Sequence, residues 1–252
     1  MHHVLSTIAH VKRALSETIV RRLLTDLLSN PTNIKDMVPF ILGLETEEQR
    51  MSMSWDYSDM FSWASYEEKT LQLERDLYKW NDVTLGNCFT FNHRNNTDAQ
   101  YLGRMTGIMG GFLASLKINS NEYCPWVDTM GIQVFVHPAE EDIFSESVST
   151  MCQPGGQTDI YPFMTAYTRL GGQYGTCIKE ASQVKQYFYT GAYATDGCLQ
   201  SCYQQACENI CGCMDPRYPM SQTASACGLT QRNCVDEVTT NLGDPTRSEF
   251  PS

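Results

Sequence analysis

Sixteen residues in the last quarter of the chain contain five cysteines, in the sequence CLQSCYQQACENICGC from Cys198 to Cys213. Thiols at this density could act as metal ligands, as a redox centre or as disulfide crosslinks. A zinc site needs cysteine pairs about two to four residues apart, with a second pair or two histidines at a matching distance. The spacing provides no matching pairs, and all five histidines lie upstream. The pattern therefore does not favour zinc.

The redox alternative also lacks its motif, because a thioredoxin-like centre needs Cys-x-x-Cys near a βαβ unit. Structural disulfides are the favoured interpretation. Cys211 and Cys213 are too close in sequence to bond each other comfortably, so each needs a distant partner, and Cys227 and Cys234 follow downstream. The economical arrangement is nested, with Cys213–Cys227 inside Cys211–Cys234. An inner loop of about 15 residues would contribute about 3 kcal/mol of stability.

The composition indicates a globular, extracellular protein. The 252 residues are 42% hydrophobic, which is enough for a core, and the net charge of −11 would repel nucleic-acid phosphates. Eleven cysteines are typical of an oxidising compartment. The N-terminal residues have no apolar run of signal-peptide length, and no stretch approaches the length of a membrane helix. We therefore expect an export signal outside this chain, or else reduced cysteines; the odd cysteine count favours the first.

Patterns typical of catalysis are missing. The sequence has no G-x-S-x-G, no glycine-rich phosphate loop and no histidine placed by a motif beside a nucleophile, so we expect neither an enzyme nor a cofactor. The acidic run Glu140-Glu141-Asp142 could bind calcium or sense protons, because crowded carboxylates attract hard cations. It lacks the glycine and the spaced oxygen ligands of a calcium loop, which favours a solvated turn.

Helices are expected before residue 80. An amphipathic helix is predicted from Val4 to Leu28, ending at Asn30-Pro31, because apolar residues recur there every three or four positions. Within residues 36–80, Thr46 is predicted to cap one short helix, and Ser65, with Glu68 three residues later, to cap another that runs to Trp80.

Strands are expected after residue 80. The β-branched and aromatic stretches GNCFTFN, GIQVFVH and YPFMTAYTRL predict strands at residues 86–92, 131–137 and 161–170. Further along, CLQSCYQQACENIC predicts a helix that gives way to a rigid turn, MDPRYP. Helices, then strands, then a disulfide-rich helical segment suggest the α+β class.

Two of these stretches carry a resemblance to a known family. The pattern Gly-x-Cys-aromatic-Thr-Phe-Asn occupies residues 86–92, and the cysteine frame at Cys198, Cys202, Cys211 and Cys213 is followed by Asp215-Pro216-Arg217. With these motifs in this order, the chain resembles the extracellular domain of the degenerin, epithelial sodium channel and acid-sensing channel family, and nematode degenerins most. The resemblance covers about residues 85–243 and, more weakly, about 36–80.

The resemblance implies a trimeric, sodium-permeable channel of the plasma membrane, in which each subunit has two membrane helices and one hand-shaped extracellular domain. Residues 1–80 would form the helical finger and knuckle, residues 81–175 the palm and β-ball, and residues 176–252 most of a disulfide-rich thumb. The implied partners are homologous subunits, sodium ions in a pore outside this chain, and an extracellular matrix or peptide ligand.

The resemblance also implies roles for the cysteines. It pairs Cys211 with Cys234 and Cys213 with Cys227, the same nested pairs that the spacing favours. It pairs Cys88 with an upstream cysteine that this chain lacks, and it gives downstream partners, also missing here, to Cys177, Cys198 and Cys202.

Some cysteines depart from the family pattern. A finger pair expected near Ser62 and Thr70 is missing, which leaves that region to packing alone or means that the alignment there is wrong. Cys124, Cys152 and Cys207 are additions, and we expect Cys124 and Cys152 to bond each other.

Two further residues have implied roles. Asn95-Asn96-Thr97 is the single glycosylation sequon, in a turn where degenerins also tend to carry one. Tyr174 falls where the family places an aromatic residue that touches the first membrane helix and couples the thumb to the gate. The alternative for Tyr174 is a buried tyrosine at a strand end.

Two functions from different classes follow. The first is the extracellular domain of an amiloride-sensitive-type sodium channel subunit. The second is a secreted, disulfide-rich binding protein that kept the fold without the pore. Cys88, Cys177, Cys198 and Cys202 lack partners within the chain, which favours the channel subunit.

Overall fold

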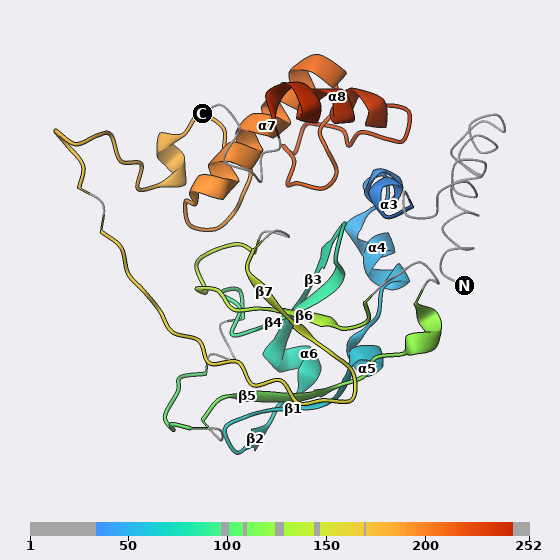
Figure 1. Cartoon of the computed structure of the whole chain (residues 1–252), viewed down its shortest axis with the longest axis vertical. Coiled ribbons are helices and arrows are strands. Elements are labelled where there is room, and N and C mark those ends of the chain that lie inside the picture. The colour runs from blue at the N-terminus through green and yellow to red at the C-terminus, as the bar shows by residue number, and fades with distance from the viewer. Residues whose placement is uncertain are drawn as a thin grey trace. The chain divides into compact units, whose positions relative to one another are not determined.

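The computed structural model describes residues 34–96, 101–107, 110–123, 129–143, 147–168 and 170–243. The chain divides into two compact units, residues 1–132 and residues 133–252. Both contain helices and strands, as the α+β class predicts (Figure 1). The helix expected from Val4 to Leu28 lies outside the described residues. None of the helices in the described part of the chain is long and apolar enough to cross a membrane.

The first unit begins with short helices. These are α3 (Ile34–Leu42), α4 (Glu47–Met53) and α5 (Tyr57–Met60). The predicted cap of α4 is confirmed: Thr46 Oγ1 accepts the N–H of Gln49 at 3.3 Å, and Gln49 Oε1 accepts the N–H of Thr46 at 2.8 Å. This reciprocal capping satisfies backbone donors that the first turn leaves open, so the helix begins where the sequence places it.

The helix predicted from Ser65 to Trp80 is wrong. Ser65 lies in β1 (Phe61–Tyr66), which turns at Glu67-Glu68 into β2 (Lys69–Thr70), and only α6 (Leu73–Asp76) is helical before β3 (Leu77–Asp82). Glu67 has φ of 53°, which a helix does not contain. Burial accompanies the difference, because Phe61 and Ala64 of β1 and Leu77 of β3 form one core cluster with Leu71.

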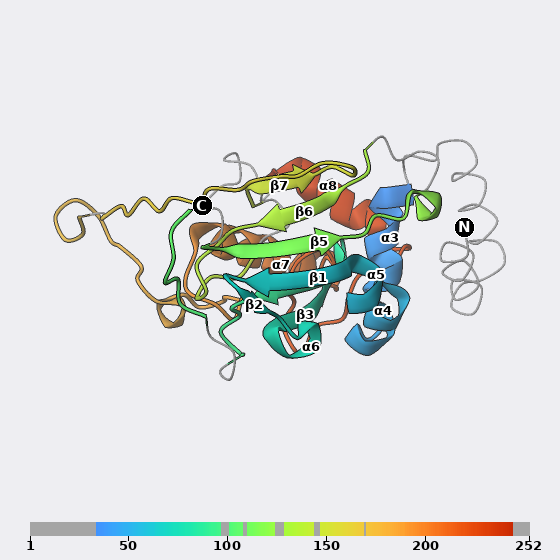
Figure 2. The ribbon, with the colours of Figure 1, turned by 90° about the horizontal axis from the view of Figure 1, so that it is seen from below.

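Antiparallel strands build the rest of this unit. β5 (Phe112–Leu116) pairs with β1 in the order β2-β1-β5, and the three strands lie side by side in Figure 2. β3 forms a hairpin with β4 (Gly86–Phe91), which confirms the predicted strand GNCFTFN and sets Trp80 opposite Cys88. Asp82 Oδ1 accepts the N–H groups of Thr84 and Leu85 at 2.8 and 2.7 Å and so closes the hairpin turn. A 3-10 turn at Ser120–Glu122 follows β5.

A strand pair lies in the described part of the second unit. β6 (Ile132–Phe135), at the boundary between the units, pairs with β7 (Ser149–Cys152), and the strand predicted in GIQVFVH is confirmed. The strand predicted at residues 161–170 is wrong, because the described part of that segment contains none. Phe163 and Met164 are 92% and 90% exposed there. A strand needs a hydrogen-bonding partner, and no other described segment pairs with these residues.

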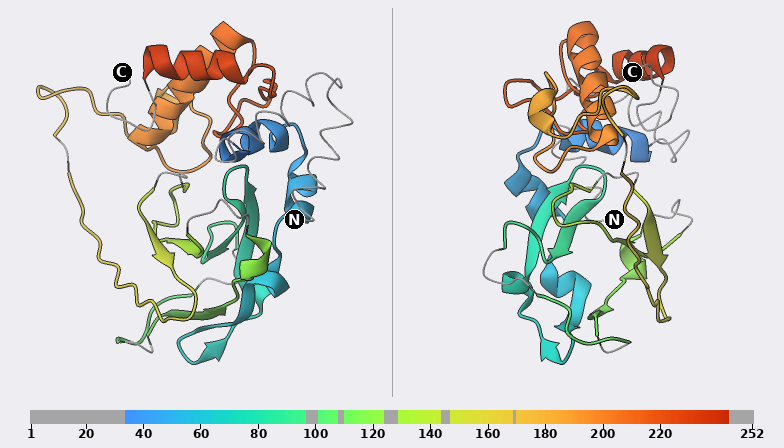
Figure 3. Two further views of the ribbon diagram at one scale, coloured as in Figure 1. Left: turned by 45° about the vertical axis from the view of Figure 1, so that its right-hand side comes forward. Right: turned by 90° about the vertical axis from the view of Figure 1, so that its left-hand side faces the viewer.

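Two helices complete the second unit, after a 3-10 turn at Ala181–Gln183. They are α7 (Thr195–Cys211) and α8 (Arg232–Leu242), and they lie close together in Figure 3. α7 confirms the helix predicted in CLQSCYQQACENIC. It ends at Gly212, whose positive φ of 71° suits a residue without a side chain. The helices share a core of Tyr203, Cys207, Tyr218 and Val238.

Candidate functional site

The candidate site is the crosslinked segment, which we define as residues 195–242: α7, the loop after it, and α8. Two disulfides close it. Cys211 bonds Cys234 with a Cα–Cα distance of 5.9 Å, and Cys213 bonds Cys227 with a Cα–Cα distance of 5.0 Å. The bonds are nested, spanning 23 and 14 positions. The outer bond joins the end of α7 to the start of α8, and the inner bond joins two positions of the loop between them.

The inner disulfide lies beside a short backbone ladder. The N–H of Met214 donates to the carbonyl oxygen of Ser225 at 3.0 Å, and the N–H of Cys227 donates to that of Met214 at 2.8 Å. Met214 and Cys227 are fully buried. Covalent and hydrogen bonds therefore hold the same two chain segments together, which leaves the loop little freedom.

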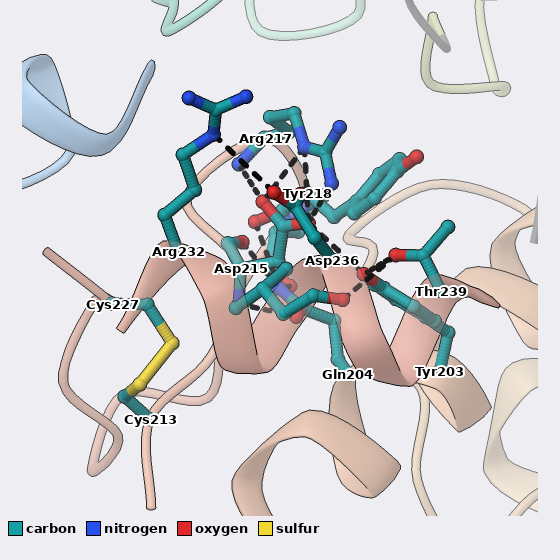
Figure 4. A network of polar contacts seen from close by, with 12 residues as sticks. Tyr203, Gln204, Cys213, Asp215, Arg217, Tyr218, Cys227, Arg232, Asp236 and Thr239 are labelled. Carbon is teal, nitrogen blue, oxygen red and sulfur yellow. Dashed lines mark hydrogen bonds and ion pairs between the residues drawn. A yellow bond between two sulfur atoms is a disulfide. The ribbon is translucent and has the colours of Figure 1, made fainter. Parts of the chain in front are cut away.

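A buried ion pair follows directly in the predicted turn MDPRYP. The carboxylate of Asp215 is fully buried and accepts hydrogen bonds from the backbone N–H of Arg217 at 3.0 Å and from its guanidinium Nη2 at 2.6 Å (Figure 4). Guanidinium Nε donates to both carboxylate oxygens at 3.0 Å. Burial disfavours the charge of Arg217, but the hydrogen bonds and charge of Asp215 outweigh it and raise the pKa of the guanidinium.

Gln204 attaches this turn to α7. Its amide Nε2 donates to the carbonyl oxygen of Asp215 at 2.9 Å and to those of Tyr218 and Pro219 at 3.1 Å. Its Oε1 accepts the N–H of Asp215 at 2.8 Å. Gln204 and Asp215 are fully buried, so removing the Gln204 amide would take these hydrogen bonds from the N–H and carbonyl groups of Asp215 where water cannot replace them.

Tyr203 connects three parts of the crosslinked segment. Its hydroxyl donates to Asp215 Oδ2 at 3.2 Å and lies 2.8 Å from Thr239 Oγ1 in α8. Burial, with the charge of Asp215 as a further cause, raises the pKa of Tyr203. Sequence reasoning singled out Asp215 and Arg217 but missed Tyr203, Gln204 and Thr239. One sequence signal could have identified Gln204: it is a polar residue on the same face of α7 as Tyr203 and Cys207.

The four cysteines expected to bond partners outside this chain have free thiols in the structure: Cys88, Cys177, Cys198 and Cys202. Cys198 and Cys202 lie one turn apart on α7, which brings them to the same helix face. Cys88 lies on β4, where burial, followed by the charge of Asp82, raises the pKa of its thiol to about 12. Partners outside this chain for the four cysteines stay a prediction.

Cys207 differs from these because it is fully buried in the core between the two helices. Burial raises the pKa of its thiol to about 11. A neutral thiol shielded from solvent is neither a nucleophile nor a metal ligand, so Cys207 serves the core as a small apolar residue.

We expect Cys207 to resist alkylation by iodoacetamide at pH 8 in the native protein and to react once guanidinium unfolds it. Because the pKa of the buried thiol is about 11, it stays protonated at pH 8, and burial keeps the reagent from the sulfur atom. Because the folded pKa exceeds the ordinary value of 9.0, the free energy of unfolding should fall as pH rises from about 9 to about 11. Peptide mass spectrometry measures the labelling, and recovery of Cys207 in a disulfide would contradict the prediction.

Tyr174 is 71% exposed, at the tip of a turn in which the N–H of Gly175 donates to the carbonyl oxygen of Gly172 at 3.3 Å. The alternative of a buried tyrosine at a strand end is therefore wrong.

Asn95 is exposed after β4, while Thr97 of its sequon lies outside the described residues. Ser62 and Thr70, where the finger cysteines are missing, lie exposed on β1 and β2.

Two remaining expectations concern Cys152 and the acidic run. Cys152 ends β7 with a free thiol, and Cys124 lies outside the described residues, so their bond stays a prediction. Residues 139–141 form a turn, in which the N–H of Glu141 donates to the carbonyl oxygen of Pro138 at 3.1 Å. In the described part of the chain, no three acidic, histidine or cysteine side chains could together hold a metal ion.

Comparison with known proteins gives a consistent result. The family described as amiloride-sensitive sodium channel matches residues 11–249. Degenerin mec-10 of Caenorhabditis elegans is 28% identical over 225 residues, which cover 88% of this chain and 31% of that protein. The degenerin-like protein unc-105 of the same organism is 28% identical over 229 residues, covering 88% and 26%. Epithelial sodium channel subunit alpha of Cavia porcellus is 33% identical over 150 residues, covering 59% and 22%. The chain thus spans less than a third of each relative.

Proposed function

Because residues 11–249 match its family description, the chain belongs to the amiloride-sensitive sodium channel family, and we propose that it is the extracellular domain of a sodium channel subunit. In this proposal the domain lies on the extracellular side of the plasma membrane. It controls a cation pore enclosed by three homologous subunits, and the pore is formed by other parts of each subunit. An extracellular matrix or peptide ligand would act on the same domain.

The crosslinked segment is the observation that carries the proposal. Two disulfides and the buried pair of Asp215 and Arg217 tie α7, its loop and α8 into one body. A segment crosslinked in this way moves as a rigid unit, because bending inside it would break buried contacts. Rigidity of this kind is what a lever needs in order to transmit a movement to the pore. In the hand description, residues 176–252 would be the thumb, residues 81–175 the palm and β-ball, and residues 1–80 the finger.

Tyr174 is proposed to couple this lever to the gate. Its side chain is exposed at the tip of a tight turn and is therefore available for contact with another segment. Cys88, Cys177, Cys198 and Cys202 would bond cysteines in parts of the subunit outside these 252 residues, and Asn95 would carry a glycan.

The proposal predicts that oocytes expressing the full-length gene product that contains this segment carry an amiloride-sensitive sodium current. Tyr174→Ala should lower that current at least about fivefold, the scale of a coupling between two sites, with the surface amount unchanged. Tyr161→Ala is the matched control, because Tyr161 is equally exposed, at 72%, and has no proposed role. Voltage clamp measures the current and surface biotinylation the protein.

Two outcomes would count against the channel. One is a protein that reaches the surface and gives no amiloride-sensitive current alone or with any homologous subunit. The other is a mature product released into the medium, which would support the secreted binding protein.

A further inference from the structure

One carboxylate joins two loops of the second unit. Asp142, in the loop after β6, accepts at Oδ2 the N–H groups of Thr190 and Gly191, both at 2.9 Å, and the hydroxyl of Thr190 at 3.3 Å. Beside it, the N–H of Ala192 donates to the carbonyl oxygen of Glu140 at 2.7 Å. Thr190, Gly191 and Ala192 belong to what we call the tyrosine strap, residues 187–194.

The other side of the tyrosine strap is attached to α7 through side chains of the helix, Gln200 and Ser201. The N–H of Phe188 donates to Ser201 Oγ at 3.1 Å, and the hydroxyl of Tyr189 donates to Gln200. Ser201 is fully buried and Gln200 nearly so. Buried partners of this kind are costly to separate, so the strap should follow α7 when the helix moves.

Tyr187 fixes the strap at the start of the helix. Its hydroxyl donates to the carbonyl oxygen of Ala192 at 3.0 Å and accepts the N–H of Ala194, the N-cap of α7, at 3.0 Å. A Cβ atom on Gly197 would lie only 2.7 Å from that hydroxyl, so glycine is what lets the ring pack against the first turn.

The two attachments differ in strength. The strap holds α7 through buried or partly buried groups, whereas two of the three hydrogen bonds to Asp142 are exposed to solvent and the third, from Gly191, is partly buried. Contacts open to solvent can be exchanged for contacts with water, so they contribute less net stability than the same contacts made in the interior. A displacement of α7 relative to the β6–β7 strand pair would therefore act first on the contact at Asp142 and on the neighbouring backbone bond between Ala192 and Glu140.

We propose that Asp142 is a positioning residue: a releasable clasp through which the tyrosine strap couples the crosslinked segment to the loop between β6 and β7. The inference rests on the proposed function, since it assigns the coupling to the gating movement of that segment. The Oδ2 atom that accepts three hydrogen bonds serves attachment rather than ion binding.

The test uses the full-length gene product in oocytes, with three variants. Asp142→Ala removes the acceptor and should lower the amiloride-sensitive current per channel at the surface at least about fivefold. Asp142→Asn keeps one carbonyl oxygen as acceptor and should give an intermediate current. Glu141→Ala removes the neighbouring exposed carboxylate and should leave the current unchanged.

Hydrogen exchange on the purified protein supplies a readout that does not depend on current. Asp142→Ala should speed exchange of the amides of Thr190 and Gly191 while the amides of α7 beyond Tyr203 stay protected. Unchanged exchange at Thr190 and Gly191 would overturn the clasp, as would equal effects of Asp142→Ala and Glu141→Ala on the current. Lack of current from the unsubstituted protein would overturn the proposed function instead, and exchange would still test the clasp.

Discussion

Replacing Asp215 by alanine is expected to lower the free energy of unfolding of the second unit by about 3 kcal/mol, because it leaves a charged group without its buried partner. The Asp215 carboxylate is fully buried and accepts hydrogen bonds from Arg217 and Tyr203. The side chain of Arg217 is 34% exposed, so water compensates part of the loss, which places the expected effect at the lower end for buried pairs. Chemical denaturation followed by circular dichroism measures the change.

The ion pair of Arg232 and Asp236 provides the matched control. It lies on α8, its shortest distance is 3.4 Å, and Asp236 is 51% exposed. Asp236→Ala should cost less than about 1 kcal/mol, as solvated pairs at this helix spacing do. Equal destabilisation by Asp215→Ala and Asp236→Ala would show that burial of Asp215 does not stabilise the crosslinked segment.

Removing the inner disulfide by the double substitution Cys213→Ala and Cys227→Ala is expected to cost more than removing the outer one. Chain entropy alone predicts the opposite by about 0.4 kcal/mol, because the outer bond closes the longer loop. Packing reverses the order, since Cys213 is 5% exposed and Cys227 is fully buried, and their lost sulfur atoms leave a void. The expected cost is about 3 kcal/mol from the loop and about 1 kcal/mol more from the void.

The comparison pair is Cys211→Ala with Cys234→Ala, whose half-buried sulfur atoms leave less of a void. Midpoints of guanidinium denaturation of both double variants, compared under oxidising conditions, decide the order. If the outer pair proves the costlier, loop entropy rather than packing governs this region. Full stability in either variant would mean that hydrogen bonds, those of Gln204 and of the backbone ladder at Met214, hold the loop without that disulfide.

Local signals sufficed for the features that depend on neighbours in sequence. Thr46 caps α4 as predicted, and β4 lies where GNCFTFN predicts a strand, because capping and β-propensity act over a few residues. The two disulfides join the pairs that spacing favours, since Cys211 and Cys213 cannot conveniently bond each other. The family, too, is readable from the cysteine frame and the Asp-Pro-Arg motif, and residues 11–249 match it.

Features that depend on distant neighbours were not readable. Ser65 and Glu68 look like a helix start, yet Phe61 and Leu77 lie in strands and are buried together with Leu71, which follows β2. The segment 161–170 has the composition of a strand, but pairing needs a second strand, and composition does not say whether one is at hand.

The sequence by itself determined the family, the mixed class, the cysteine-rich helix and its turn, because each follows from residue types at short spacing. Only the tertiary structure decided what surrounds them. It brought Gln204 and Tyr203 of α7 onto Asp215 and set Thr239 of α8 beside Tyr203. It also brought the carboxylate of Asp142 to the backbone N–H of Thr190, 48 positions further along the chain. The reason is physical: a buried polar group must find a partner wherever the fold supplies one, and sequence separation does not limit that choice.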